Sequence, residues 1–90
     1  MYRLSYTHTF EKDIKKIKKR GYDTKILTEV IKSLEIKGTV SKNLLPHKLS
    51  GNYSDCWECH LKPDWLLIWR KTKNPDMIQL IRTGKHTDLF

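Results

Sequence analysis

The apolar run at residues 65–69 (WLLIW) constrains the fold more than any other stretch of this sequence. With two aromatic residues and one β-branched residue, this short run predicts a strand that is buried on both faces, at the centre of a sheet. Pro63, which lacks a backbone donor, and Asp64 come directly before it and predict a tight turn. We therefore expect a strand at residues 53–62, then the turn, and then a central strand at 65–71.

The strand before the turn carries a polar face. Because side chains alternate along a strand, Glu58, His60 and Lys62 share one face, whereas Cys59 and Leu61 share the other. One face of a sheet is enough to build a core. The face with an acid, a histidine and a lysine is therefore the candidate working surface.

A first amphipathic helix is expected early in the chain. Thr9 is its expected N-cap, and Phe10, Ile14 and Ile17 recur at helical spacing. Gly21 ends it. Its other faces carry six cations, which predict either an RNA-facing ridge or the solvated side of a helix: Lys12, Lys15, Lys16, Lys18, Lys19 and Arg20.

A second helix follows, capped by Asp23 or Thr24 and ended by Gly38. Its apolar stripe is formed by Leu27, Val30, Ile31 and Leu34. Two amphipathic helices joined by a short loop form a hairpin whose apolar seam has to lie on a sheet.

The remaining stretches predict a first strand at 2–7, a loop at 39–46, an edge strand at 47–50, a turn at 73–76, a last strand at 77–82 and a closing tail at 83–90. The element order β-α-α-β-β-β indicates a single α+β domain over residues 1–90. We expect a mostly antiparallel sheet of four or five strands, with the helical hairpin on one face and the other face open.

The charge of the chain favours a polyanionic partner. Eighteen basic residues against ten acidic residues give a net charge of +8. Nucleic acid is the first expectation, an acidic protein the second, and a merely solvated basic surface the alternative. No stretch approaches the length of a membrane helix and no signal-peptide pattern opens the chain, so we expect a cytoplasmic protein without a membrane partner.

Residues 56–60 (CWECH) match the C-x-x-C-H pattern of covalent haem attachment, and the two cysteines could also begin a zinc site. A separation of three along a regular strand points the sulfur atoms of Cys56 and Cys59 to opposite faces, however. We expect buried thiols, with a c-type haem protein as a minor alternative.

Four histidines are present, and three of them, His47, His60 and His86, lie beside the late strands, whereas His8 lies at the first strand–helix junction. Imidazole titrates near neutrality, so paired histidines can give and take protons without a metal. Histidines, cations and a basic surface suit metal-free RNA cleavage, in which a 2′-hydroxyl attacks its own phosphate.

Three segments carry a resemblance to a known family: residues 47–51 (HKLSG), 58–68 (ECHLKPDWLLI) and 82–90 (RTGKHTDLF). They closely resemble the YafQ-type toxins of the RelE superfamily, and the likeness covers nearly the whole chain. The resemblance implies the toxin of a bacterial toxin–antitoxin pair. It also implies a ribosome-dependent endoribonuclease that cuts messenger RNA, and a cognate antitoxin that silences it.

The resemblance places the active-site positions at His47, His60, Asp64, His86 and Phe90, with Trp65 and Arg82 in support. The chain departs from the family pattern where Trp57 replaces a typical arginine and Glu58 a usual aspartate. Lys85 stands in place of a small hydroxyl residue, and Lys85 or Lys62 would have to supply the missing charge.

We expect these residues to act without metal or cofactor: His86 as general acid, His47 as base, His60 and Asp64 as groups that position the phosphate or tune pKa values, Arg82, Lys62 and Lys85 as phosphate contacts, Glu58 as a substrate contact, and Phe90 or Trp65 as a stacking platform. The alternative is a basic module that binds RNA or the ribosome without catalysis.

Overall fold

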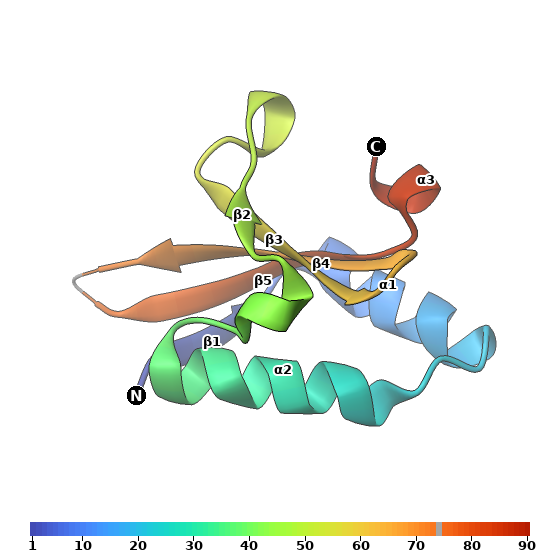
Figure 1. The fold of residues 1–90 in the computed structure, drawn as a ribbon, viewed down its shortest axis with the longest axis horizontal. Helices are drawn as coiled ribbons and strands as arrows, with labels where there is room; N and C mark the ends of the chain where they lie inside the picture. The colour runs from blue at the N-terminus through green and yellow to red at the C-terminus, as the bar shows by residue number, and fades with distance from the viewer. Residues whose placement is uncertain (74) are drawn as a thin grey trace.

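The computed structural model describes residues 1–73 and 75–90. Its elements are β1 (Arg3–Tyr6), α1 (His8–Lys19), α2 (Thr24–Lys37), a 3₁₀ turn (Lys42–Leu44), β2 (His47–Lys48), a second 3₁₀ turn (Gly51–Tyr53), β3 (Cys56–Lys62), β4 (Trp65–Thr72), β5 (Met77–Gly84) and α3 (His86–Leu89). The strands form one sheet in the order β1-β5-β4-β3-β2, with β1 parallel to β5 and the other pairs antiparallel (Figure 1). The predicted α+β fold is thus confirmed, with β4 as the central strand.

The helical hairpin covers one face of the sheet, as predicted (Figure 1). Phe10 and Ile17 of α1 and Leu34 of α2 are buried in a core shared with Leu67 and Ile78 of the strands. Burial of such side chains is worth about 1.5–3 kcal/mol each, which is why a short hairpin with many lysines is held there.

The helix ends differ from the prediction at one cap. The side chain of Thr7, not that of Thr9, caps α1 and accepts a hydrogen bond from the backbone N–H of Phe10 in the first turn. Asp23 caps α2, and Gly38 ends it in the left-handed conformation, as predicted. The turn predicted at 73–76 includes Asn74, which lies outside the described residues.

The other face of the sheet is not open, contrary to the prediction. Cys56, Leu66 and Ile68 on this face are buried under Leu89 of α3, with Leu49, Tyr53 and Ile81 packed at the margin. Helix α3 was not predicted. It brings the C-terminus onto the sheet face opposite the helical hairpin, beside the candidate working surface (Figure 1).

The two cysteines lie on opposite sides of the sheet, as expected. Cys59 belongs to the core under the helices, whereas Cys56 belongs to the cluster under α3. In the part of the chain that the structure describes, no helix is both long and apolar enough to cross a membrane.

Candidate active site

The site begins with a close contact between side chains of two neighbouring strands. His47 of β2 lies opposite Glu58 of β3, and its Nε2 is 3.2 Å from Oε1 of the carboxylate. The other ring nitrogen, Nδ1, is 2.9 Å from the carbonyl oxygen of Leu45. Because a carbonyl only accepts, Nδ1 carries a proton in this arrangement. Nε2 is therefore the nitrogen that can exchange a proton, next to a carboxylate.

Glu58 is a buried carboxylate, with only 6% of its surface exposed. Its second oxygen, Oε2, is buried without a hydrogen-bond partner among residues 1–73 and 75–90. Because the side chain is buried, it acts on neighbouring residues and is hardly accessible to solvent. It fixes the ring of His47, and its charge adds to the burial that raises the pKa of Cys59.

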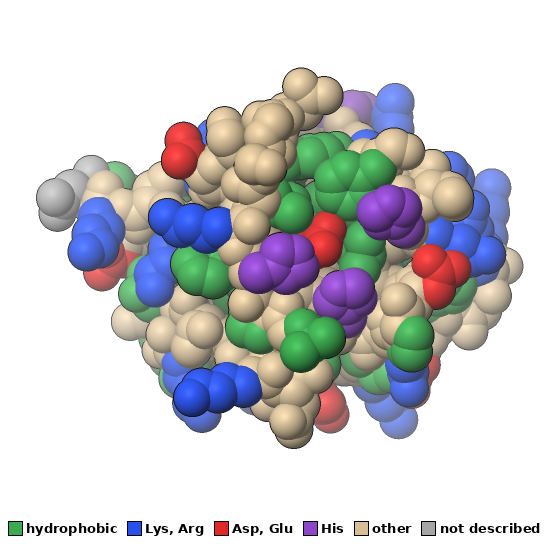
Figure 2. Space-filling view, turned by 45° about the horizontal axis from the view of Figure 1, so that its top comes forward, with side chains coloured by type: hydrophobic (Ala, Val, Ile, Leu, Met, Phe, Trp, Pro, Cys, Tyr) green, Lys and Arg blue, Asp and Glu red, His purple; other side chains and the backbone are tan. Residues whose placement is uncertain are grey.

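His60 lies beside this pair. Its ring is 6.3 Å from that of His47, centroid to centroid, with 30° between the planes. His60 is also opposite Leu66, which is in turn opposite Gly84 at the end of β5. This row of residues leads across the sheet to the start of α3, where His86 lies. Figure 2 shows histidine side chains gathered on one face around an acidic side chain.

An aromatic group stands at the C-terminus. The ring of Phe90 lies 4.9 Å from that of His86 and 5.5 Å from that of Tyr53. The hydroxyl of Tyr53 donates to the carbonyl of Leu89 at 3.4 Å. Phe90 is 55% exposed, so one side of its ring is free to stack on a base.

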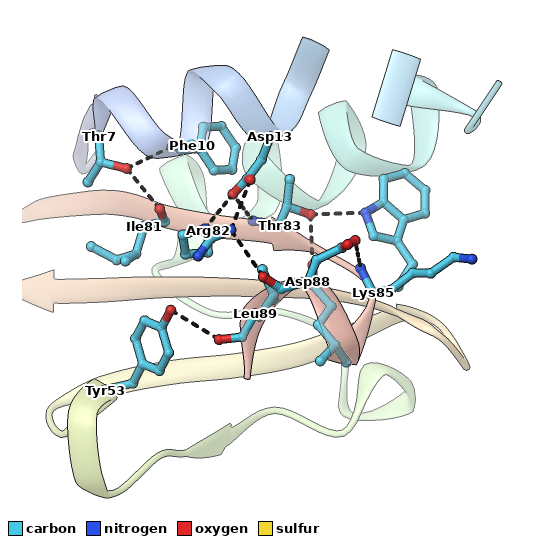
Figure 3. A network of polar contacts seen from close by, with 12 residues as sticks. Thr7, Phe10, Asp13, Tyr53, Ile81, Arg82, Thr83, Lys85, Asp88 and Leu89 are labelled. Carbon is cyan, nitrogen blue, oxygen red and sulfur yellow. Dashed lines mark hydrogen bonds and ion pairs between the residues drawn. The ribbon is translucent and has the colours of Figure 1, made fainter. Parts of the chain in front are cut away.

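A polar network not anticipated from the sequence joins α1 to the end of β5 (Figure 3). The buried carboxylate of Asp13 accepts from Nε of Arg82 at 2.8 Å, from Nη2 at 3.2 Å and from the backbone N–H of Thr83 at 3.1 Å. The carboxylate raises the pKa of Arg82 through these hydrogen bonds. A signal was present in the sequence: Asp13 occupies a position of the apolar stripe, between Phe10 and Ile17.

The main contact of Arg82 is therefore structural, since its guanidinium joins β5 to Asp13 of α1. Asp13 engages Nε and one terminal nitrogen, and that same nitrogen also lies 3.4 Å from the carbonyl oxygen of Asp88. Only 22% of the side chain is exposed. A phosphate could therefore contact only the part of the Arg82 guanidinium that is not bonded to Asp13.

The prediction that Trp65 stacks on a base is wrong. Trp65 is 3% exposed, packs in the core with its ring 4.9 Å from that of Tyr22, and donates from Nε1 to Oγ1 of Thr83 at 2.9 Å. The alternation of the strand turns its side chain toward the helices. Phe90 remains as the exposed aromatic candidate.

Three of the predicted residues line one hollow beside the β3–β4 hairpin. Lys62 and Asp64 at the hairpin tip and Lys85 at the start of α3 are exposed, and they line a hollow of about 420 Å³ together with Tyr22 and Trp65. Asp64 is thus placed beside two lysines, at the end of the strand that carries His60. Asp64 forms no hydrogen bond or ion pair with a histidine within the described residues.

The residues do not form a metal centre as they are placed. Within residues 1–73 and 75–90, no group of three or more His, Cys, Asp or Glu side chains is arranged to hold a metal ion. The face offers imidazole next to a carboxylate and an exposed aromatic ring, and Lys62 and Lys85 are exposed at its edge, where they line the hollow beside Tyr22. These groups suit proton transfer and phosphate binding, so the fold and the site define a small basic protein of the nucleic-acid-processing class.

The chain belongs to the YafQ family of bacterial toxins of type II toxin–antitoxin systems, whose family model matches residues 2–90. The mRNA interferase toxin YafQ of Escherichia coli K12 is 30% identical over 89 residues, which cover 97% of this chain and 94% of that protein. A metal-bound toxin from Helicobacter pylori is 36% identical, with a TM-score of 0.91 and full coverage of both chains. YafQ in the E. coli DinJ–YafQ complex is 27% identical, with a TM-score of 0.89 over 100% of this chain and 99% of that one.

Proposed function

We propose that this protein is the toxin of a type II pair and acts as an mRNA interferase, an endoribonuclease that cuts messenger RNA on the ribosome. Family membership and the relative named as an mRNA interferase support the proposal. The observation that carries it is the His47–Glu58 pair beside His60, on the face over which α3 brings His86 and Phe90. The reaction is attack of a 2′-hydroxyl on its own phosphate, which gives a 2′,3′-cyclic phosphate and a 5′-hydroxyl.

In this proposal His47 takes the proton of the attacking hydroxyl. Nδ1 is committed to the Leu45 carbonyl, so Nε2 and the adjacent Glu58 are the groups that can share the incoming proton. His86 gives a proton to the 5′-oxygen that leaves. His60, on β3 and therefore between β2 and β5 in the sheet, contacts the phosphate, and Phe90 stacks on a base.

The charge on the phosphate is met by lysines. Lys62 at the hairpin tip and Lys85 at the start of α3 are exposed and line one hollow with Asp64, whereas the guanidinium of Arg82 is held by Asp13. Lysine can take over a phosphate contact as a point charge. This would compensate for Trp57, which stands where the family typically has an arginine.

The proposed partners are the ribosome, messenger RNA and a cognate acidic antitoxin, all met in the cytoplasm. The net charge of +8 favours each of these polyanionic or acidic partners. The crystallised complex of DinJ with the E. coli relative supports an antitoxin for this chain.

Single-turnover cleavage on programmed ribosomes tests the proposal. General acid–base groups contribute about 10²–10⁴-fold, so we expect His86→Ala to lower the rate by at least about 10² while ribosome binding is unchanged. His8→Ala, an exposed residue at the start of α1, is the matched control and should cleave as the wild type does.

A substrate with a 5′-thio leaving group separates the two proton roles. A thiolate leaves without protonation, so this substrate should restore much of the lost rate in His86→Ala but not in His47→Ala. Equal rescue of both variants would refute the assignment of acid and base. A wild-type protein that binds programmed ribosomes without cutting the message would instead identify a non-catalytic binding module.

A further inference from the structure

An ion pair joins the end of α1 to α3. Nη1 of Arg20 is 2.7 Å from Oδ2 of Asp88, and Nη2 is 3.3 Å from Oδ1. The ion pair is bidentate and joins residues that are 68 positions apart in the sequence. Arg20 ends the run of cations on α1, and nothing in its sequence context distinguished it from the lysines beside it.

The same carboxylate holds the entry to α3. Oδ2 of Asp88 accepts from the backbone N–H of Lys85 at 2.9 Å (Figure 3). The hydrogen bonds from Arg20 and then from Lys85 lower the pKa of Asp88 well below its usual range. The carboxylate is therefore charged at neutral pH, and it connects the end of α1 to the start of α3.

Helix α3 depends on such contacts. Four residues cannot sustain a helix alone, because nucleation is costly. Its other ties are the buried side chain of Leu89 and two long hydrogen bonds of 3.4 Å, from Arg82 to the Asp88 carbonyl and from Tyr53 to the Leu89 carbonyl. The bond from Arg20 is the shortest that α3 makes to a distant element among the described residues.

We propose that Arg20 is a positioning residue for RNA cleavage: through Asp88 it holds α3 in place, so that His86 and Phe90 meet the substrate in a fixed geometry. The inference rests on the proposed function, because it takes His86 as the group that acts on the leaving oxygen. Small displacements of a reacting group are costly, and about 1 Å can reduce a rate by about 10²-fold. Arg20 differs in this from the neighbouring lysines of α1, whose side chains form no hydrogen bond to α3 among residues 1–73 and 75–90.

The test compares Arg20→Gln, Asp88→Asn and the double variant in single-turnover cleavage over a range of ribosome concentrations. We expect each single variant to lower the maximal rate about 10-fold or more, with the half-saturating ribosome concentration within about twofold of wild type. Because both substitutions remove one contact, the double variant should be no slower than the slower single variant. Arg3→Gln, which removes an exposed arginine of β1 outside this contact, is the control and should keep the wild-type rate.

A second measurement reports position without catalysis. The imidazole NMR signals of His86 should shift in the same direction in Arg20→Gln and Asp88→Asn, while those of His8 stay in place. Additive rate losses, or a change confined to the half-saturating concentration, would overturn the proposal and make Arg20 a direct RNA contact. Unmoved His86 signals would overturn it too. The proposed function fails separately, if His86→Ala cleaves at the wild-type rate.

Discussion

The fold buries the carboxylates of Asp13 and Glu58, and each carboxylate holds a neighbouring side chain in place. Asp13 binds Arg82 and the Thr83 N–H, and Glu58 binds His47. A buried carboxylate without such partners would cost several kcal/mol, on the order given by desolvation of a charge. These buried carboxylates orient Arg82 and His47, the groups proposed to act at the surface of the site.

Cys59 provides a pH-dependent prediction at the scale of one residue. Burial first, and the charge of Glu58 second, raise the pKa of its thiol to about 12. The unfolded chain loses this proton near pH 8.5. Between those values the folded protein holds a proton that the unfolded chain releases, so its free energy of unfolding should fall as the pH rises from about 8.5 toward 12.

Chemical denaturation of the wild type and Cys59→Ala at pH 7.5 and pH 10 measures this effect. The loss of stability with rising pH should be smaller in Cys59→Ala, whatever that substitution costs at pH 7.5. Equal losses in both proteins would contradict the prediction. A thiol reagent at pH 8 should likewise label Cys59 far more slowly in the folded protein than in denaturant.

At the scale of elements, the short helix α3 depends on one glycine. Gly84 has φ +150°, and a Cβ there would lie 3.0 Å from Oδ2 of Asp88. We expect Gly84→Ala to lower the free energy of unfolding by about 1–3 kcal/mol through backbone strain, and to displace the Asp88 carboxylate. Cleavage should fall as α3 moves.

Introducing Gly84→Ala into the Asp88→Ala variant separates backbone strain from displacement of the Asp88 carboxylate. Without the carboxylate the close approach disappears, so Gly84→Ala should then cost stability but slow cleavage little further. Thermal unfolding and single-turnover cleavage of the four proteins give the comparison. Wild-type cleavage by Gly84→Ala would show that the position of α3 does not matter for the reaction.

The regular elements were predictable because each carries its own local pattern. The apolar run at 65–69, the Pro63–Asp64 turn and the alternation around His60 located β4 and the end of β3. The predicted start of β3 near Tyr53 was wrong, because Tyr53 lies in a 3₁₀ turn and β3 begins at Cys56. Helix α3 was not predictable, because a four-residue helix is stabilised by contacts to α1 and to the sheet rather than by its own sequence. The burial of Trp65 and the use of Arg82 by Asp13 also depend on partners more than ten positions away.

At the scale of the whole molecule, the faces differ in composition. The helical hairpin covers the core on one face, and the opposite face, with His47 and His60, carries the proposed chemistry. The net charge of the chain is +8. An acidic antitoxin segment that covers this basic surface should therefore bind through charge as well as through apolar contact.

Salt dependence tests this form of neutralisation. We expect the product of a neighbouring acidic reading frame to co-purify with this protein, and its dissociation constant to rise with salt, since the Debye length falls from about 8 Å at 0.15 M to about 3 Å at 1 M. The His86→Ala variant should bind equally well, because the contact does not require activity. An affinity indifferent to salt would refute an electrostatic contribution, and growth arrest that the partner leaves unrelieved would refute neutralisation.

The parallel pairing of β1 with β5 has a consequence for biogenesis. Arg3 lies opposite Met77, and Thr7 hydrogen-bonds to the carbonyl of Ile81, so the first strand has no sheet to join until nearly the whole chain exists. Such distant contacts form late, after the entropy of closing a long loop has been overcome. The nascent chain therefore cannot complete the sheet that carries the site before β5 has been synthesised. A protein proposed to cut messenger RNA on the ribosome thus acquires its fold only after nearly ninety of its own codons have been translated.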